Sequence, residues 1–418
     1  MSAAPRSALD SPDFRRLTGA RFLLAFALQV QSLVMAWQVY SIKHDPLALG
    51  LIGLVEAVPA LALALLAGDV VDRGDPLRIY RGVIVGALAS ATLLFVVSLP
   101  ALRVPGPSLV YWIYAAGFMT GCARGFSQPA TYALVPQMVP RESLSHSSAW
   151  LTTAFQMASV IGPGLGGVLF AWRGATLPYG LDCALLVAAV FCASTIGFRP
   201  APGGARAEAK AAETAFRRIT SGLRFVFADQ VLLSALALDM FAVLFGGVEA
   251  ILPIFAADIL RIGASGLGLL QAAPSLGALL GGALMIRRPP NRGAGKTLLW
   301  VVTGFGVCII AFALSRSVWV SVGLLALAGG LDSVSMVIRG AIVQLSSPPD
   351  MRGRVAAVNA IFIGTSNELG AFESGVAAKL LGTVPSVVFG GVLTLATVAG
   401  AALWSPRLRA MDIDGLKT

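Results

Sequence analysis

Charged residues are scarce in this sequence, and their scarcity excludes a soluble protein of ordinary composition. Asp, Glu, Lys and Arg make up 12% of the 418 residues, hydrophobic residues make up 56%, and the mean hydropathy is +0.80. Soluble domains carry roughly 25% charged residues. The composition therefore predicts a polytopic membrane protein.

Cysteine and histidine are also scarce, and the sequence lacks the usual motifs of enzymes. The four cysteines lie in apolar runs, which indicates small buried side chains rather than disulfides or a metal site. The two histidines lie in loops far apart, and no nucleotide-binding loop or nucleophile motif is found. We therefore expect no enzyme, no cofactor, no metal and no ATP hydrolysis by this chain.

Long apolar runs fill most of the chain, and each has about the length needed to cross a bilayer. The polar and basic residues 1–21 lack the pattern of a cleavable signal peptide, so we expect the first run to be a true span. Twelve transmembrane helices are predicted, near residues 17–42, 47–71, 78–100, 108–134, 144–172, 177–198, 229–257, 264–286, 297–315, 317–345, 355–380 and 384–405.

The net charge of +10 follows the predicted topology. If the N-terminus is cytoplasmic, most of the 31 lysines and arginines fall on cytoplasmic loops or helix ends, while Arg124 and Arg339 lie within spans. This bias predicts that both termini are cytoplasmic, and it makes a nucleic-acid partner unnecessary. The basic residues predicted outside are Lys43, Arg103, Arg173, Arg261, Arg316 and Lys379.

The second half of the chain repeats the first when residue numbers are shifted by 215. The matching pairs are Gly53 and Gly268, Glu56 and Gln271, Pro59 and Pro274, and Arg124 and Arg339. The repeat indicates two pseudo-symmetric six-helix bundles, with a binding cavity between them near the bilayer midplane. We expect an N-terminal bundle at 1–198, a cytoplasmic linker with an amphipathic segment at 199–228, and a C-terminal bundle with a short tail at 229–418.

A short charged stretch, from Gly68 to Arg81, separates the second and third apolar runs. Its glycine, followed by Asp72-Arg73 and further arginines, resembles the loop between helices 2 and 3 of the major facilitator superfamily. Together with the twelve spans and the repeat, this stretch makes nearly the whole chain similar to a transporter of that superfamily. The resemblance implies the all-α major facilitator fold and a conformational latch formed by Gly68, Asp72, Arg73 and Arg78.

Two further stretches, 127–136 and 351–355, are similar to the bacterial branch that includes the enterobactin exporter and macrolide efflux proteins. This similarity implies a multi-pass protein of the bacterial cytoplasmic (inner) membrane that exports a drug or a siderophore.

The fifth run carries Gly162-Pro163-x-x-Gly166-Gly167, which is similar to the antiporter motif of the superfamily. Glycines remove side-chain bulk so that another helix can pack closely, and proline bends the helix. Generic packing by small residues explains the same pattern, and this alternative stays open. The similarity favours export over import.

Acidic residues inside the predicted spans are candidates for proton coupling. A charge at mid-bilayer costs a few kcal/mol, so each acid needs a cavity, a partner or a proton. The coupling candidates are Glu56, Asp239 and Glu368, and Glu56 stands first because its repeat mate is a glutamine that cannot titrate. A structural pair with Arg124 or Arg339 is the alternative. The acids within spans are Glu56, Asp182, Asp239, Glu249, Asp332, Glu368 and Glu373.

Two classes of function remain in competition at this point. The first is a secondary active exporter of amphipathic small molecules, working by proton antiport and alternating access. The second is an importer or facilitator of a polar nutrient such as a sugar or an organic acid, which would need several polar groups at mid-depth. We expect the partners to be a small-molecule substrate, protons and the lipid bilayer, and the protein to be a monomer. The cavity candidates are Gln29, Gln31, Arg124, Asn359 and Asn367.

Overall fold

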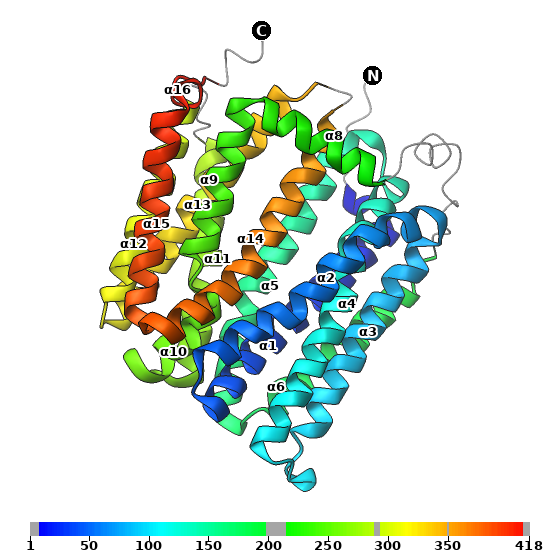
Figure 1. The fold of residues 1–418 in the computed structure, drawn as a ribbon. Coiled ribbons are helices and arrows are strands. Elements are labelled where there is room, and N and C mark those ends of the chain that lie inside the picture. The colour runs from blue at the N-terminus through cyan, green and yellow to red at the C-terminus, as the bar shows by residue number, and fades with distance from the viewer. Residues whose placement is uncertain (1–7, 198–214, 288–292, 349–350, 413–418) are drawn as a thin grey trace. The chain divides into compact units, whose positions relative to one another are not determined.

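The computed structural model describes residues 8–197, 215–287, 293–348 and 351–412, apart from the side chains of a few helical residues such as Asp72. Helices make up this described part of the chain, and no strand occurs in it (Figure 1). The prediction of an all-α protein is confirmed.

Helices of the first half begin at residues that suit a helix start. The Ser11 hydroxyl accepts a hydrogen bond from the Phe14 amide ahead of Pro12, and the Asp75 carboxylate accepts from the Leu77 amide ahead of Pro76. Both arrangements satisfy amides that have no partner within the helix. The helices are α1 (Pro12–Lys43), α2 (Pro46–Arg73), α3 (Pro76–Val97), α4 (Gly106–Met138), α5 (Leu144–Arg173) and α6 (Thr176–Ser194).

The second half follows the same plan, with one helix interrupted. The short elements η4 (Glu249–Ile251), α10 (Leu252–Ile254) and the π-helical η5 (Phe255–Ile259) continue the path of the first long helix of this half. The remaining elements are α8 (Ala215–Ala228), α9 (Gln230–Gly246), α11 (Gly263–Arg287), α12 (Ala294–Leu314), α13 (Val318–Ser346), α14 (Arg352–Leu381), α15 (Thr383–Trp404) and α16 (Pro406–Arg409).

Ten helical segments among the described residues are long and apolar enough to cross a membrane. The α9 segment counts as one of them together with the short elements that follow it, over Gln230–Ile259. Helices α4 and α14 have 33 and 30 residues but are not among the ten, because their sequences are more polar. The membrane-spanning architecture is confirmed, while a count of twelve spans stays a prediction for these two helices.

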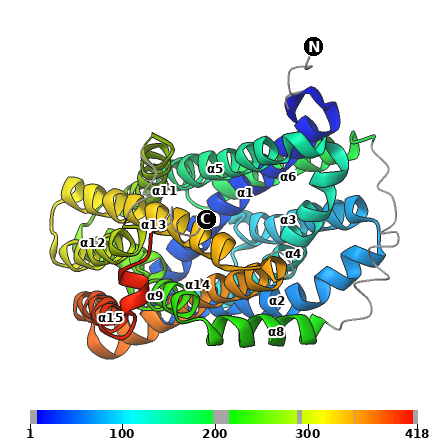
Figure 2. The ribbon, with the colours of Figure 1, turned by 90° about the horizontal axis from the view of Figure 1, so that it is seen from above.

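The chain forms two compact units, and each is described here by itself. Unit 1 comprises Met1–His44, Val55–Ala212 and Gly263–Ala272. Within it, α1 packs against α5 and α6, and α3 packs against α4 and α6 (Figures 1 and 2). Burial of large side chains such as Phe14 and Tyr80, both 0% exposed, gives this unit its core.

Unit 2 comprises Asp45–Leu54, Glu213–Ile262 and Ala273–Thr418. Within it, α12 packs against α13 and α15, and α9 packs against α14 and α15. Helix α8, the described end of the predicted linker, is amphipathic: Val226 is buried, Phe227 is exposed, and Gly222 lies against the backbone of α14.

Each unit holds a glycine against a proline of a neighbouring helix. In unit 1, Gly121 of α4 lies so close to Pro59 of α2 that a Cβ added to it would be 2.7 Å from the proline Cγ. In unit 2, Gly329 of α13 lies against the backbone of Pro274 of α11, the repeat mate of Pro59. Small residues allow such close helix packing in membranes.

Candidate functional site

Unit 1 contains an acid–arginine pair between α2 and α4. The Arg124 Nη1 atom lies 3.0 Å from Glu56 Oε2, and the two side chains are 44% and 11% exposed. Gly121 lets α4 approach α2 at Glu56, since a Cβ added to it would clash with the Glu56 carbonyl oxygen. Glu56 is thus held in a structural pair, which the sequence left open as the alternative to a free coupling acid.

Unit 2 contains a second and more deeply buried pair. Asp239 of α9 contacts Arg339 of α13, and their side chains are 7% and 3% exposed. Arg339 is the repeat mate of Arg124, but the acids come from helices that the repeat does not relate. Asp239 lies nine residues from the start of α9, which corresponds to a depth of about 14 Å.

A small cavity adjoins the buried pair. It has a volume of about 10 Å³ and is bordered by Asp239, Asp332 and Ser335, with apolar residues of α9, α12 and α13 completing its wall. Asp332, Ser335 and Arg339 are spaced i, i+3 and i+7, so they share one face of α13. Asp332 lies 14 residues from each end of α13, about 21 Å, and is therefore near mid-depth.

The first long helix of unit 2 is broken near this cavity. Helix α9 ends at Gly246, and the next helical turn begins at Glu249. The Ser374 hydroxyl of α14 donates to the Gly247 carbonyl over 2.7 Å, which satisfies one backbone group freed by the break. Non-helical backbone at membrane depth is tolerated where protein or water surrounds it. The span predicted at 229–257 is confirmed over Gln230–Ile259, with a break between Gly246 and Glu249 inside it.

The remaining cavity candidates occupy different environments, and their contact with substrate stays a prediction. Gln31 is 1% exposed and donates to the Ser90 and Thr120 hydroxyls, each over 3.0 Å, so it joins α1, α3 and α4 inside unit 1. Gln29 is half-buried and lies against Gly162, while Asn359 is half-buried and has a buried Oδ1 atom without a hydrogen-bond partner in the described chain.

Asn367 is exposed on α14, and the neighbouring Glu368 is half-buried. Because Glu368 does interact with other groups, it is not an isolated acid.

The helix 5 motif packs α5 onto two other helices of unit 1. Gly162 lies against Phe26 and Gln29 of α1, and Gly166 lies against Val30 on the next turn of the same helix. Gly167 lies against the backbone of Ala264 in the first turn of α11. Each glycine is thus at a close helix contact, which fits the packing role; a direct role in antiport stays a prediction.

The predicted latch stretch ends α2 and begins α3. Gly68 has open space around it, Arg73 is exposed, and Arg78 forms an exposed ion pair with Asp75 over 3.2 Å. The side chain of Asp72 lies outside the described residues, so the latch that it would form stays a prediction.

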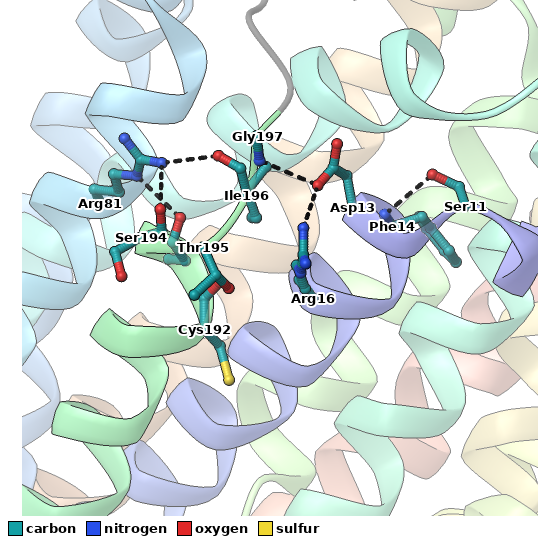
Figure 3. A network of polar contacts seen from close by, with 11 residues as sticks. Ser11, Asp13, Phe14, Arg16, Arg81, Cys192, Ser194, Thr195, Ile196 and Gly197 are labelled. Carbon is teal, nitrogen blue, oxygen red and sulfur yellow. Dashed lines mark hydrogen bonds and ion pairs between the residues drawn. The ribbon is translucent and has the colours of Figure 1, made fainter.

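Arg81, at the end of this stretch, binds the end of α6 (Figure 3). Its guanidinium donates to the carbonyls of Ala193, Ser194 and Ile196 over 3.0, 3.3 and 3.2 Å. A cation at a helix C-terminus satisfies carbonyls that lack a partner and interacts favourably with the helix dipole. Beside it, Asp13 accepts from the Gly197 amide over 3.1 Å, so α1, α3 and the chain after α6 are joined at one end of unit 1.

Sequence reasoning counted Glu249 and Asp332 among the acids within spans but did not select them. Two signals could have done so: the Gly-Gly pair before Glu249, which suggests a helix break, and the polar spacing of Asp332, Ser335 and Arg339 on one helix face. The described residues contain no group of three or more His, Cys, Asp or Glu side chains placed to hold a metal ion.

These features define a class of protein. Two repeat-related sets of membrane-spanning helices, with an acid–arginine pair inside each, describe a membrane transporter of the major facilitator fold. Solved structures support this fold. A POT family transporter in complex with a thioalcohol-conjugated peptide matches with a TM-score of 0.75 at 11% identity, covering 94% of this chain and 96% of that chain. A D-xylose-proton symporter matches with a TM-score of 0.71 at 14% identity, covering 96% and 99%.

The chain belongs to the family described as transmembrane secretion effector, whose model matches residues 3–417. The enterobactin exporter EntS of Salmonella typhimurium is 26% identical over 394 residues, covering 92% of each chain. The resemblance to the major facilitator superfamily, and to its branch with the enterobactin exporter, is confirmed.

Proposed function

We propose that this chain exports an amphipathic small molecule of the siderophore or drug type in exchange for protons, by alternating access. The family match over nearly the full chain carries the proposal, together with relatives that are named as exporters of enterobactin. The protein would lie in the bacterial inner membrane as a multi-pass monomer with both termini in the cytoplasm. The positive-inside charge distribution supports that orientation.

The acid–arginine pairs supply a chemical basis for coupling. A carboxylate in a membrane-embedded pair has two ways to be neutralised, by its arginine or by a proton. Protonation would release the arginine, so the pair would change its interactions with each proton bound and lost. A bound ligand shifts the balance between two conformations only through its different affinity for each.

The proton gradient is large enough for useful export. One proton that crosses 100 mV provides about 2.3 kcal/mol. Because about 1.4 kcal/mol corresponds to a tenfold ratio, one proton per substrate supports a gradient of roughly 50-fold. The chain need not hydrolyse ATP to reach that ratio.

Transport by purified protein in proteoliposomes tests this proposal. Vesicles carry an imposed proton gradient, and the accumulation of enterobactin and of ethidium is measured separately. We expect at least one of these probes to accumulate against its gradient, and accumulation to stop when an ionophore dissipates the proton gradient. Accumulation that ignores the gradient would exclude antiport, and movement of D-xylose in place of both probes would favour the nutrient importer.

A further inference from the structure

Unit 2 holds more acids than bases around its buried arginine. Arg339 contacts Asp239, and Asp332 borders the same cavity on the same face of α13. Glu249, at the helix break, is a further acid of this unit but does not border the cavity. In unit 1, by contrast, Glu56 and Arg124 form a pair with equal and opposite charges.

In the described chain, the other helices packed against α9 bring no lysine or arginine to the depth of Asp239. Helix α15 has no charged residue, and the only charged residue of α12 is Lys296, exposed in its first turn. Helix α14 adds the acids Glu368 and Glu373, while its Lys379, near the last turn, pairs with Asp45. The arginines of the described parts of α8, α14 and α16 lie near helix ends, at Arg224, Arg352, Arg354, Arg407 and Arg409.

This imbalance has a physical consequence. Two aspartates that share one arginine in a poorly hydrated site carry a surplus negative charge, and an isolated buried charge is too costly to persist without a partner or a proton. The surplus therefore falls on Asp239 and Asp332, which border the same cavity, and a shared proton neutralises it.

The cavity supplies the connection between the two carboxyl groups. Its volume of about 10 Å³ is close to the space that the centre of one water molecule needs. Asp239, Asp332 and Ser335 are its polar lining residues, so the hydrogen-bond partners of such a water would come from them. A buried water typically makes about three hydrogen bonds.

We propose that Asp239 and Asp332 hold one proton between them through a water molecule in this cavity. The proton passes between the two carboxyl groups through that water; each transfer breaks one O–H bond and forms another. Arg339 keeps its charge and loses an ionised partner. A role for this proton in driving export rests on the antiport proposed above. The binding of the proton to unit 2 does not depend on antiport.

Infrared difference spectroscopy of the purified protein tests the site without substrate or gradient. The carbonyl stretch of protonated carboxyl groups is recorded over a pH titration, in water and in deuterium oxide. Relative to wild type, we expect Asp332→Asn to lack the amplitude of one carboxyl group, because Asp239 and Arg339 then balance each other. The double variant Asp239→Asn/Arg339→Gln should keep that amplitude on Asp332, whose charge then has no arginine. The double variant removes acid and base together, so it leaves no unpaired arginine.

Arg339→Gln alone should show the opposite change. Without its arginine the surplus grows to two charges, so we expect a band larger than that of wild type. Glu142→Gln, which removes an exposed acid, is the matched control and should give the wild-type spectrum. A wild-type band in Asp332→Asn, or a band smaller by one carboxyl group in the double variant, would overturn the shared proton. A proton-binding band in a protein whose transport ignores the proton gradient would instead overturn only the antiport.

Discussion

Replacing Arg339 by glutamine is expected to destabilise unit 2 far more than replacing its repeat mate Arg124 destabilises unit 1. Both arginines pair with a carboxylate, but Arg339 is 3% exposed and Arg124 is 44% exposed. Removing one partner of a buried pair leaves an uncompensated charge and costs roughly 3–5 kcal/mol. A pair that water reaches contributes about 0–1 kcal/mol. The two substitutions are chemically identical, so the difference between their effects on the free energy of unfolding reports the burial of the pair.

The native cysteines allow each unit to be followed separately. Cys308 of α12 is 5% exposed, so a chain that retains only this thiol reports the opening of unit 2 to a thiol-reactive dye. Cys183 of α6 is half-buried and serves the same purpose for unit 1. The free energy of unfolding in detergent micelles is measured for Arg339→Gln and Arg124→Gln in both backgrounds.

A double variant checks the cause of the loss. Asp239→Asn/Arg339→Gln removes both charges, so we expect it to recover at least half of the stability lost in Arg339→Gln alone. Equal losses from the two arginine variants would refute the argument from burial. A double variant no more stable than Arg339→Gln would refute the ion pair as the source of the effect.

Two further outcomes follow from local contacts. A Cβ added to Gly375 of α14 would lie 2.8 Å from the Gly50 Cα, so Gly375→Leu should destabilise unit 2 by about 1–3 kcal/mol, and a wild-type unfolding curve would contradict this. Asp182 of α6 is 0% exposed, and neither of its carboxyl oxygens has a hydrogen-bond partner in the described chain. Because Asn keeps its shape, Asp182→Asn should leave proton-driven accumulation of the transported probe unchanged; a tenfold loss would make Asp182 a coupling residue.

Hydropathy predicted where helices cross the membrane but not where they begin. The run predicted at 384–405 corresponds to α15 at Thr383–Trp404, and the run at 78–100 corresponds to α3 at Pro76–Val97. Helix α1, however, starts five residues before its predicted span. Its start is set by Ser11 and Pro12, and a cap is a hydrogen-bonding feature that an apolar average does not detect.

The candidate site was predictable in part. The repeat showed that Arg124 and Arg339 are related, and the cost of buried charge showed that the acids need partners. The choice of partners could not be read from one sequence, because Glu56 and Arg124 are 68 positions apart and only the packing of α2 on α4 brings them together. Likewise, the cavity beside Asp332 depends on how α9, α12 and α13 pack.

The two arginines show how a duplicated scaffold can acquire different chemistry in its halves. The repeat places an arginine on α4 and on α13, but their acids come from α2 and from α9, which the repeat does not relate. Unit 1 then has one acid for its arginine, and unit 2 has a second acid across a cavity the size of a water molecule. A balanced pair has no charge reason to bind a proton, whereas a pair with a surplus acid does. Glu56 stays a predicted coupling residue on the ground of its glutamine repeat mate, and the charge surplus adds Asp239 and Asp332 as the proposed proton-binding pair.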